Sequence, residues 1–230
     1  MAKHLDLEEQ EQLDEIKHFW KQYGNAITTV LLVVLTSIAG WNGYQYWMRT
    51  QSVQAAAMFD EVERVVRTGD MEKTLRAFSD MKDKFGSTAY AQQAGLMVAK
   101  SFAEGGRIDD AKTALAWVME KSSDRGYSMI ARLRLAGLLV DLKAYDDALG
   151  LLKMEATAPF TGLVADRRGD IFALTGKKPE AIREYQAALQ TLAAQSEYRQ
   201  LIEVKLHALG GAVLEKVGQA GGAPKTSESK

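Results

Sequence analysis

One uncharged segment limits most strongly what this chain can fold into. It extends from Gln22 to Met48, and its centre, from Ala26 to Gly40, reads AITTVLLVVLTSIAG. In a helix, about 20 apolar residues at roughly 1.5 Å each cross the hydrocarbon core of a bilayer. We therefore predict a transmembrane helix over residues 25–48. Residues 1–24 form a tail that includes a juxtamembrane helix.

Aromatic side chains flank this segment on both sides, as they do where a helix passes through the lipid headgroups. We expect four of them to be membrane-interface anchors: Trp20 and Tyr23 before the span, and Trp41 and Trp47 after it. A buried core helix is one alternative, but such helices are usually shorter and are seldom flanked by aromatic residues in this way. The pattern favours a membrane span.

A cleaved signal peptide is a second alternative, because Val53-Gln54-Ala55 has the small residues of a cleavage site. However, the apolar run is longer than the roughly 7 to 15 residues that are typical of a signal peptide. The segment before it is acidic where a signal peptide is basic, with Asp6, Glu8, Glu9, Glu11, Asp14 and Glu15. We therefore predict that the helix is retained.

The charges beside the span predict its orientation. Lys17 and Lys21 lie shortly before it, and Arg49 lies shortly after it. Because lysine and arginine are in excess on the cytoplasmic side of a span, this small difference favours a cytoplasmic N-terminus. It places the chain from residue 50 onward outside the cytoplasm.

The juxtamembrane segment has an apolar face of its own. Leu13, Ile16, Trp20 and Tyr23 recur every three or four residues, so we expect the helix to continue from this segment into the span. Two interpretations stay open, a plain extension of the span and a helix that docks on a cytosolic partner.

Composition sets the fold class. Three prolines and many alanine, leucine, glutamate and lysine residues favour long helices joined by glycine turns, and hence an all-α fold. The chain has no cysteine, which excludes disulfides, thiol catalysis and zinc-thiolate sites. Its formal net charge of -1 gives no reason to expect a nucleic-acid partner.

A turn pattern recurs four times after the predicted span, at residues 69–74, 106–111, 143–148 and 176–181. The last residues of these segments are 37, 37 and 33 positions apart, close to the period of about 34 in a tetratricopeptide repeat. We predict four helical hairpins and a capping helix over 198–216. The first helices of the hairpins are expected at 55–67, 88–104, 127–141 and 163–175, and the second helices at 72–85, 109–121, 146–153 and 180–194.

The match to the repeat pattern is uneven. The second unit has Ala99, Phe102 and Ala111 at the expected spacing, and the third has Ala148 at the matching position. In the first unit, Thr74 replaces the small alanine, so we expect irregular packing there. The sequence predicts a tetratricopeptide-like α-solenoid over residues 49–217, with a plain helical bundle as the alternative. The Gly- and Ser-rich tail, 218–230, is predicted to be disordered.

A stack of such hairpins presents an inner face lined by its first helices, which commonly binds peptides or proteins. For two of the expected contact residues, Leu96 and Leu133, a place in the core is the stronger interpretation. The full set of candidate protein-binding residues is Leu96, Lys100, Leu133, Gly137, Asp166 and Asp170.

The sequence offers no catalytic motif. His4, His18 and His207 lack the spacing of metal ligands, and Gly105-Gly106 lacks the frame of a phosphate-binding loop. The acidic pair at 109–110 recurs at 146–147, and each pair stands at the start of a predicted second helix, where it stabilises the N-terminal dipole. We predict no enzyme activity, no metal and no cofactor.

The order of these parts carries a family resemblance. The segment 16–24 reads IKHFWKQYG; the span follows, then Gly40-Trp41 and Tyr46-Trp47, and then the degenerate repeats. The chain resembles the YfgM-type family of ancillary subunits of the bacterial Sec translocon. The resemblance implies a single-pass inner-membrane protein with a cytoplasmic N-terminus and a periplasmic repeat domain. Its implied partners are the Sec translocon, a membrane-anchored periplasmic chaperone and newly exported client proteins. It implies no contact residue.

Another function class stays open beside this one. A membrane-anchored repeat domain is also what an envelope scaffold for another assembly requires, such as one for cytochrome maturation or cell division. An enzyme is a distant third.

Overall fold

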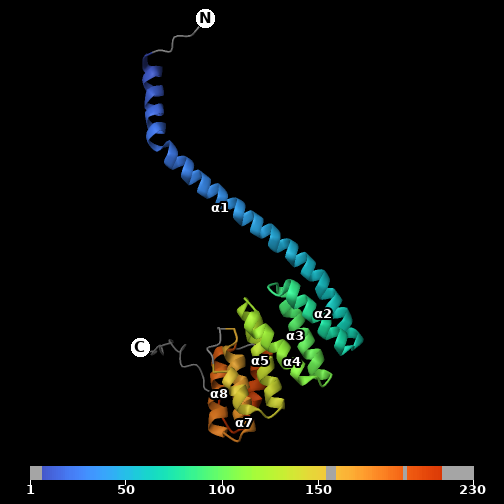
Figure 1. Cartoon of the computed structure of the whole chain (residues 1–230). Helices are drawn as coiled ribbons and strands as arrows, with labels where there is room; N and C mark the ends of the chain where they lie inside the picture. The colour runs from blue at the N-terminus through green and yellow to red at the C-terminus, as the bar shows by residue number, and fades with distance from the viewer. Residues whose placement is uncertain (1–6, 154–158, 194–195, 214–230) are drawn as a thin grey trace, which may run out of the picture. The chain divides into compact units, whose positions relative to one another are not determined.

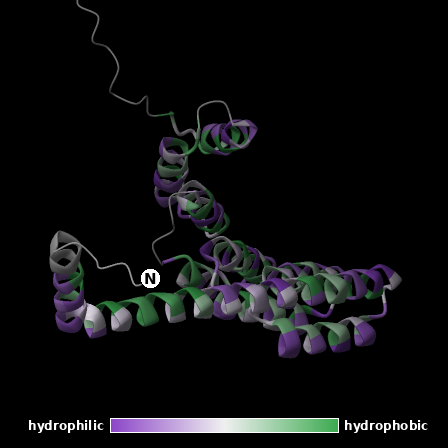
Figure 2. Cartoon of the chain, turned by 90° about the horizontal axis from the view of Figure 1, so that it is seen from above, coloured by the Kyte–Doolittle hydropathy of each residue, from purple (hydrophilic) through white to green (hydrophobic). Residues whose placement is uncertain are grey.

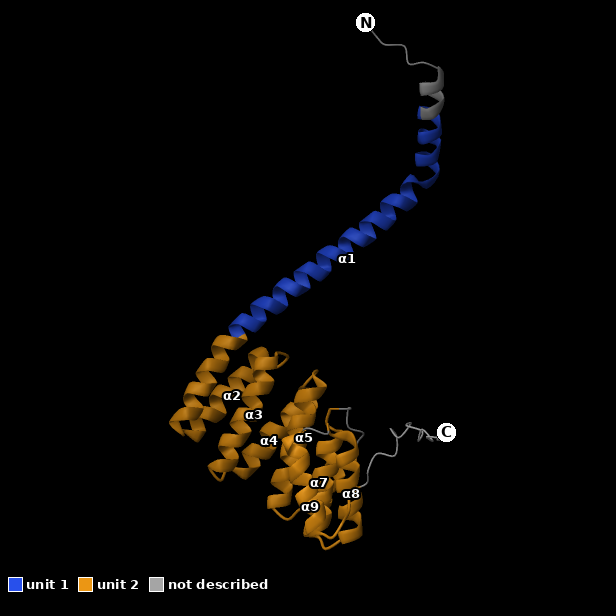
Figure 3. Ribbon diagram, turned by 180° about the vertical axis from the view of Figure 1, so that it is seen from behind, with its two compact units in different colours: residues 1–54 blue, residues 55–230 orange. Residues whose placement is uncertain are grey.

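The computed structural model describes residues 7–153, 159–193 and 196–213, and within these ranges every regular element is an α-helix. The predicted all-α class is therefore confirmed. The chain divides into two compact units, Met1–Gln54 and Ala55–Lys230 (Figure 3). Helix α1, Leu7–Thr68, passes without a break from the first unit into the second. The predicted boundaries at residues 24 and 48 lie inside this helix and stay predictions. The predicted tail 218–230 lies outside the described residues.

The first unit consists of the N-terminal part of α1. In the described part of the chain, α1 is the one helix that is long and apolar enough to cross a membrane, by length and composition. Its apolar run stands out in Figure 2 as a hydrophobic stretch of ribbon, and its large side chains, from Val30 to Leu35, are exposed rather than packed. An exposed apolar helix of this length fits a lipid environment rather than water.

Hydroxyl groups in the apolar run are satisfied within the helix. The side chains of Thr28, Thr29, Thr36 and Ser37 each donate to the backbone carbonyl four residues earlier, at 2.7–2.8 Å. No water is present in the bilayer core to satisfy such groups, so these bonds remove a cost of placing them there. The polar residues of the run are thus compatible with the predicted span.

The second unit is a stack of helical hairpins (Figure 1). Helices that are neighbours in the chain pack against each other. In addition, α3 contacts α5, and α5 contacts α7. This is the predicted arrangement of four hairpins and a further helix. After the last part of α1, Ala55–Thr68, its helices are α2 Met71–Phe85, α3 Ala89–Glu104, α4 Ile108–Lys121, α5 Arg125–Asp141, α6 Tyr145–Leu151, α7 Thr161–Leu174, α8 Lys178–Thr191 and α9 Glu197–Ala208.

The four predicted turns share one backbone conformation. A residue with positive φ follows the end of the first helix of each hairpin by one or two positions: Gly69 at 72°, Gly106 at 77°, Lys143 at 60° and Gly176 at 75°. After three of these helices, a backbone amide also bonds to the carbonyl five residues earlier, as in Arg107 N to Phe102 O at 2.8 Å. This left-handed ending satisfies the last carbonyls of the helix. Glycine adopts it without strain, which is why glycine marks three of the four turns.

A fifth turn corrects the prediction for the last helix. We expected that helix to continue to Lys216, but α9 ends at Ala208. Gly210 then has a φ of 71°, and the amide of Gly211 donates to the carbonyl of Leu206 at 3.0 Å. Gly210 follows Gly176 by 34 residues, the spacing of one repeat. Helix α9 thus ends in the same way as the first helix of a repeat, and it is shorter than the predicted capping helix.

The core of the second unit is made of three apolar clusters. The largest joins the helices from the end of α1 to α5, the second lies between α5, α6 and α7, and the third joins α7, α8 and α9. The first hairpin, for which we expected irregular packing, has one polar defect in this core. Thr74 is fully buried, and its hydroxyl has no hydrogen-bond partner in the part of the chain that the structure describes.

Candidate protein-binding groove

A groove with a volume of about 600 Å³ crosses the first helices of the second, third and fourth hairpins. Its apolar lining includes Ala99 of α3, Leu115 of α4 and Leu138 of α5. Three of the six predicted contact residues, Lys100, Leu133 and Gly137, line the same groove. The structure therefore brings half of the predicted set together on one surface.

The fourth predicted residue, Leu96, lies in the core. Its side chain is only 7% exposed, as the stronger interpretation of the sequence expected. Its backbone carbonyl accepts a hydrogen bond from Nη1 of Arg134 at 3.2 Å. Leu96 thus serves the groove through its backbone, by fixing an arginine of the next repeat at the groove wall.

The cations of the groove outnumber its carboxylates. Lys100, Arg134 and Arg167 line it together with one acidic residue, Asp141. The ammonium group of Lys100 lies 3.7 Å from the carboxylate of Glu104, but both side chains are largely exposed, so this pair is weak. The groove combines an apolar lining with a net positive charge.

Gly137 lies where the third and fourth repeats meet. A Cβ atom at this position would approach the guanidinium of Arg167 at 3.8 Å and nothing more closely. A glycine in the middle of a helix costs about 1 kcal/mol relative to alanine, and close packing does not require one here. The absence of a side chain at Gly137 keeps the groove open beside Arg167.

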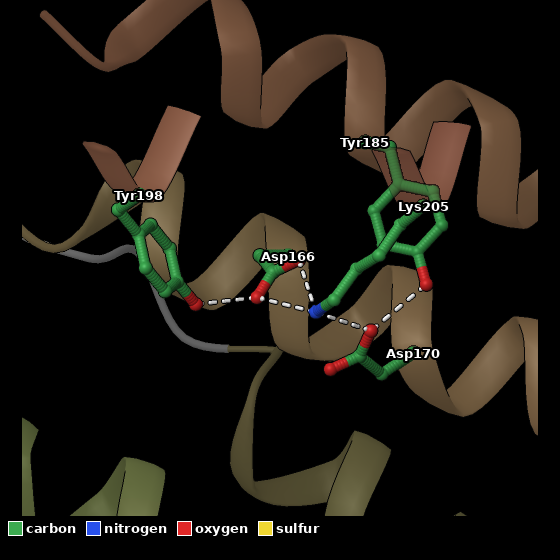
Figure 4. A network of polar contacts seen from close by, with 5 residues as sticks. All are labelled: Asp166, Asp170, Tyr185, Tyr198 and Lys205. Carbon is green, nitrogen blue, oxygen red and sulfur yellow. Dashed lines mark hydrogen bonds and ion pairs between the residues drawn. The ribbon is translucent and has the colours of Figure 1, made fainter. Parts of the chain in front are cut away.

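The last two predicted residues, Asp166 and Asp170, lie in a different site. Both belong to α7, and Lys205 of α9 extends between them (Figure 4). Nζ of Lys205 lies 2.8 Å from Oδ1 of Asp166 and 2.8 Å from Oδ1 of Asp170. The hydroxyl of Tyr198 donates to Asp166 at 2.5 Å, and that of Tyr185 donates to Asp170 at 2.8 Å. We refer to these five residues as the α7–α9 network.

The α7–α9 network is a structural contact between repeats. Asp166 is only 2% exposed, so its charge needs the cation and the hydroxyl that face it. Burial, and then the bond to the Asp170 carboxylate, raise the pKa of the Tyr185 phenol. Burial and the bond to Asp166 raise the pKa of Tyr198 in the same way. Both tyrosines therefore stay protonated donors, and neither aspartate is free for a ligand.

Sequence reasoning missed the two arginines of the groove. Arg134 and Arg167 each follow a predicted contact residue by one position, and they are 33 residues apart. The turns of the same two repeats, at Lys143 and Gly176, have that same spacing. A search for charged residues that recur at the repeat period would have found them. Lys205 and Tyr198 carry no such signal, because only the tertiary fold pairs them with α7.

Comparison with known proteins places both units in one family. A model of the tetratricopeptide repeat-like domain matches residues 17–211. A protein of Neisseria gonorrhoeae named "Ancillary SecYEG translocon subunit" is 31% identical over 210 residues, which cover 91% of this chain and 100% of that protein. This chain belongs to the family of ancillary SecYEG translocon subunits. The resemblance found in the sequence is therefore confirmed.

Other members of the ancillary SecYEG translocon subunit family match over similar lengths. The protein of Haemophilus influenzae is 28% identical over 205 residues, which cover 88% of this chain and 98% of that protein. The protein of Escherichia coli is 25% identical over 189 residues, which cover 80% and 88% respectively. The family model covers residues 17–211, so the likeness includes the apolar helix as well as the hairpins.

Proposed function

We propose that this chain is a non-enzymatic, membrane-anchored subunit that associates with the Sec translocon and assists newly exported proteins. The observation that carries the proposal is the match to a protein named as an ancillary SecYEG translocon subunit along that protein's whole length. The match includes an apolar helix fit to span a bilayer and a repeat domain of a kind that binds other proteins. The proposed location is the bacterial inner membrane.

The proposed topology has a cytoplasmic N-terminus and a periplasmic repeat domain. The lysines before the span support it, as does an anchor that precedes a long C-terminal domain. In this orientation the groove faces the compartment into which translocated chains emerge. The further proposed partner is a membrane-anchored periplasmic chaperone, and no nucleic-acid partner is proposed.

Affinity capture of the full chain after mild solubilisation tests the association. We expect the subunits of the SecYEG translocon to copurify with the wild-type chain. A matched control replaces residues 25–48 with an unrelated apolar span and shows whether the span makes the contact. Capture that returns no translocon subunit contradicts the proposal. Capture of cytochrome-maturation or cell-division proteins in their place favours the envelope-scaffold alternative.

Reporters fused to each end test the topology independently. We expect an alkaline phosphatase reporter, which is active only outside the cytoplasm, to be active at the C-terminus and inactive at the N-terminus. The opposite pattern would place the groove in the cytoplasm and contradict a role in handling exported chains.

A further inference from the structure

The side chains that line the groove of α3, α5 and α7 indicate the chemistry of the segment that it can bind, beyond what the repeat fold alone indicates. Its lining is aliphatic, with Leu133 and Leu138 half-buried and open to the groove. The cationic side chains of Lys100, Arg134 and Arg167 lie beside this lining. An occupant that satisfies both must present apolar side chains and negative groups within a few residues of each other.

Arg167 is the best-placed group for a negative partner. It is half-buried, and its guanidinium has no ion pair or hydrogen bond within the residues that the structure describes. The acids nearest to it in sequence, Asp166 and Asp170, are already bound to Lys205. A guanidinium has five donors in a planar fork that matches a carboxylate. An unpaired one beside an apolar groove is suited to an incoming carboxylate.

The guanidinium of Arg134 is positioned by a hydrogen bond to the backbone of α3. One of its nitrogens donates to the carbonyl of Leu96, which spans the junction between α3 and α5. This bond leaves the other donors of the guanidinium available and limits the freedom that binding would remove. Arg134 and Arg167 come from successive repeats, so together they suit a chain that runs along the groove across both helices.

Gly137 adds independent support. Its position in the middle of α5 opposes helix stability, and a Cβ atom there would meet only the guanidinium of Arg167 in ordinary contact. By contrast, a Cβ at Gly95 would approach Val118 at 2.5 Å, so that glycine is required by packing. Gly137 is explained if the groove must admit a backbone next to Arg167.

We propose that this groove binds an extended segment of a client protein in which aspartate or glutamate alternates with aliphatic residues, and that Arg134 and Arg167 bind its carboxylates. This inference rests on the proposed function, since it names the kind of client segment that the repeat domain holds. It assigns the aliphatic side chains of the segment to the lining formed by Leu133 and Leu138.

Peptide binding to the full chain in neutral detergent tests the proposal. The probe is a fluorescent peptide of alternating leucine and aspartate, and the matched probe has asparagine in place of each aspartate. We expect the wild-type chain to bind the aspartate peptide at least about tenfold more tightly, because charge-assisted hydrogen bonds are stronger than neutral ones. Fluorescence anisotropy measures both affinities, and high salt should reduce the difference.

Two variants assign the preference to this groove. In R134Q/R167Q, we expect affinity for the aspartate peptide to fall to that for the asparagine peptide, with the latter unchanged. In Gly137→Leu, we expect both peptides to bind about tenfold more weakly, because the new side chain fills the apolar lining. The control variant R76Q/R183Q removes two arginines from α2 and α8 and should bind like the wild type. Circular dichroism verifies that each variant is folded.

Several results would overturn the inference. These are equal affinity of the wild-type chain for the two peptides, no measurable binding of either, and an equal loss in the R76Q/R183Q control. Capture of SecYEG by R134Q/R167Q separates the two proposals. An arginine variant that loses the peptide preference but still captures the translocon supports the groove. Failed capture by the wild-type chain contradicts the proposed function without altering the peptide measurement.

Discussion

The second hairpin and the C-terminal end of the repeat domain hold their helices together by different chemistry. In the second hairpin, Gly95 of α3 lets Val118 and Phe78 approach the helix backbone. Phe78 in turn packs edge-to-face against Trp117, with ring centroids 5.5 Å apart. Every one of these contacts is apolar.

At the C-terminal end, another helix glycine faces an aromatic ring that carries a hydroxyl group. A Cβ atom at Gly169 of α7 would approach the ring of Tyr185 at 2.6 Å. The hydroxyl of that ring donates to Asp170, which also binds Lys205 in the α7–α9 network. In both places, a glycine in a helix lets a large side chain approach the backbone. At Gly95 the approaching side chains belong to an apolar core, and at Gly169 the approaching side chain belongs to the α7–α9 network.

The difference teaches what fixes the position of a terminal helix. Apolar packing is favourable but has little directional preference, and α4 is held on both sides by α3 and α5. Helix α9 packs chiefly against α8, and its contact with α7 includes two ion pairs beside the shared apolar cluster. Ion pairs between α7 and α9 supply the geometric specificity that a helix with fewer neighbours lacks.

Removal of the cation should have the largest effect. In Lys205→Met, Asp166 loses its cation in a buried position, and the two carboxylates of α7 repel each other. We expect a loss of roughly 3 kcal/mol in the free energy of unfolding, at the low end of the range for breaking a buried pair, because Lys205 is partly exposed. Chemical denaturation measures the loss, and hydrogen exchange should show the greatest loss of protection in α9.

A compensated variant tests whether the charges or the packing produce this effect. The triple variant D166N/D170N/K205M removes the cation and both acids together, so no buried charge remains unpaired. We expect it to recover at least half of the lost stability. If it is as unstable as K205M, then the stem of Lys205, and not its charge, holds α9.

Filling a tight glycine should have the next largest effect. In Gly95→Ala, the new methyl group would lie 2.5 Å from Val118 Cγ2 and 3.1 Å from Phe78 Cζ, so Val118 of α4 or its helix must shift. After the gain in helix propensity, we expect a net loss of about 1 to 2 kcal/mol in the free energy of unfolding.

Gly137→Ala is the matched control for that substitution, with the opposite expected sign. Its Cβ meets nothing within 3.8 Å, so it should gain about 0.5 to 1 kcal/mol from helix propensity. Thermal unfolding of both variants gives the comparison. Equal effects at the two glycines would show that helix propensity, and not close approach, governs both.

The sequence predicted the hairpins because the repeat turns carry local signals. Gly69, Gly106 and Gly176 end helices by adopting positive φ, and a glycine that recurs at the repeat spacing is visible in the sequence itself. Lys143 adopts the same conformation without being glycine, and the repeat spacing alone located it. The end of α9 was missed, although Gly210-Gly211 follows the fourth turn at the repeat spacing, because the apolar pattern beyond it suggested a longer helix.

The candidate contact residues were predicted less completely, for a physical reason. Helix periodicity identifies which positions face inward, so Lys100, Leu133 and Gly137 were found together. It does not reveal which inward residues pair across repeats. Asp166 and Asp170 fit the same lattice, yet Lys205 of a later helix binds them. Long side chains such as Arg134 also enter the groove from positions beside the lattice.

A modest effect is expected at the tyrosine on the edge of the α7–α9 network. In Tyr198→Phe, Asp166 loses a donor but keeps Lys205, so we expect a loss of about 1 kcal/mol in the free energy of unfolding at pH 7. Burial and the bond to Asp166 raise the pKa of Tyr198 above its ordinary 10.0. The stabilisation by the phenol is therefore fully present below pH 10 and is lost as the pH rises toward the folded-state pKa.

This sign makes the difference between wild type and Tyr198→Phe depend on pH in a defined way. Denaturation from pH 8 to the highest pH at which both proteins fold should show a constant difference up to about pH 10 and a shrinking one above it. A difference that stays constant throughout would mean that the hydroxyl contributes by shape alone. The polar end of the repeat domain would then be stabilised by packing, as the second hairpin is.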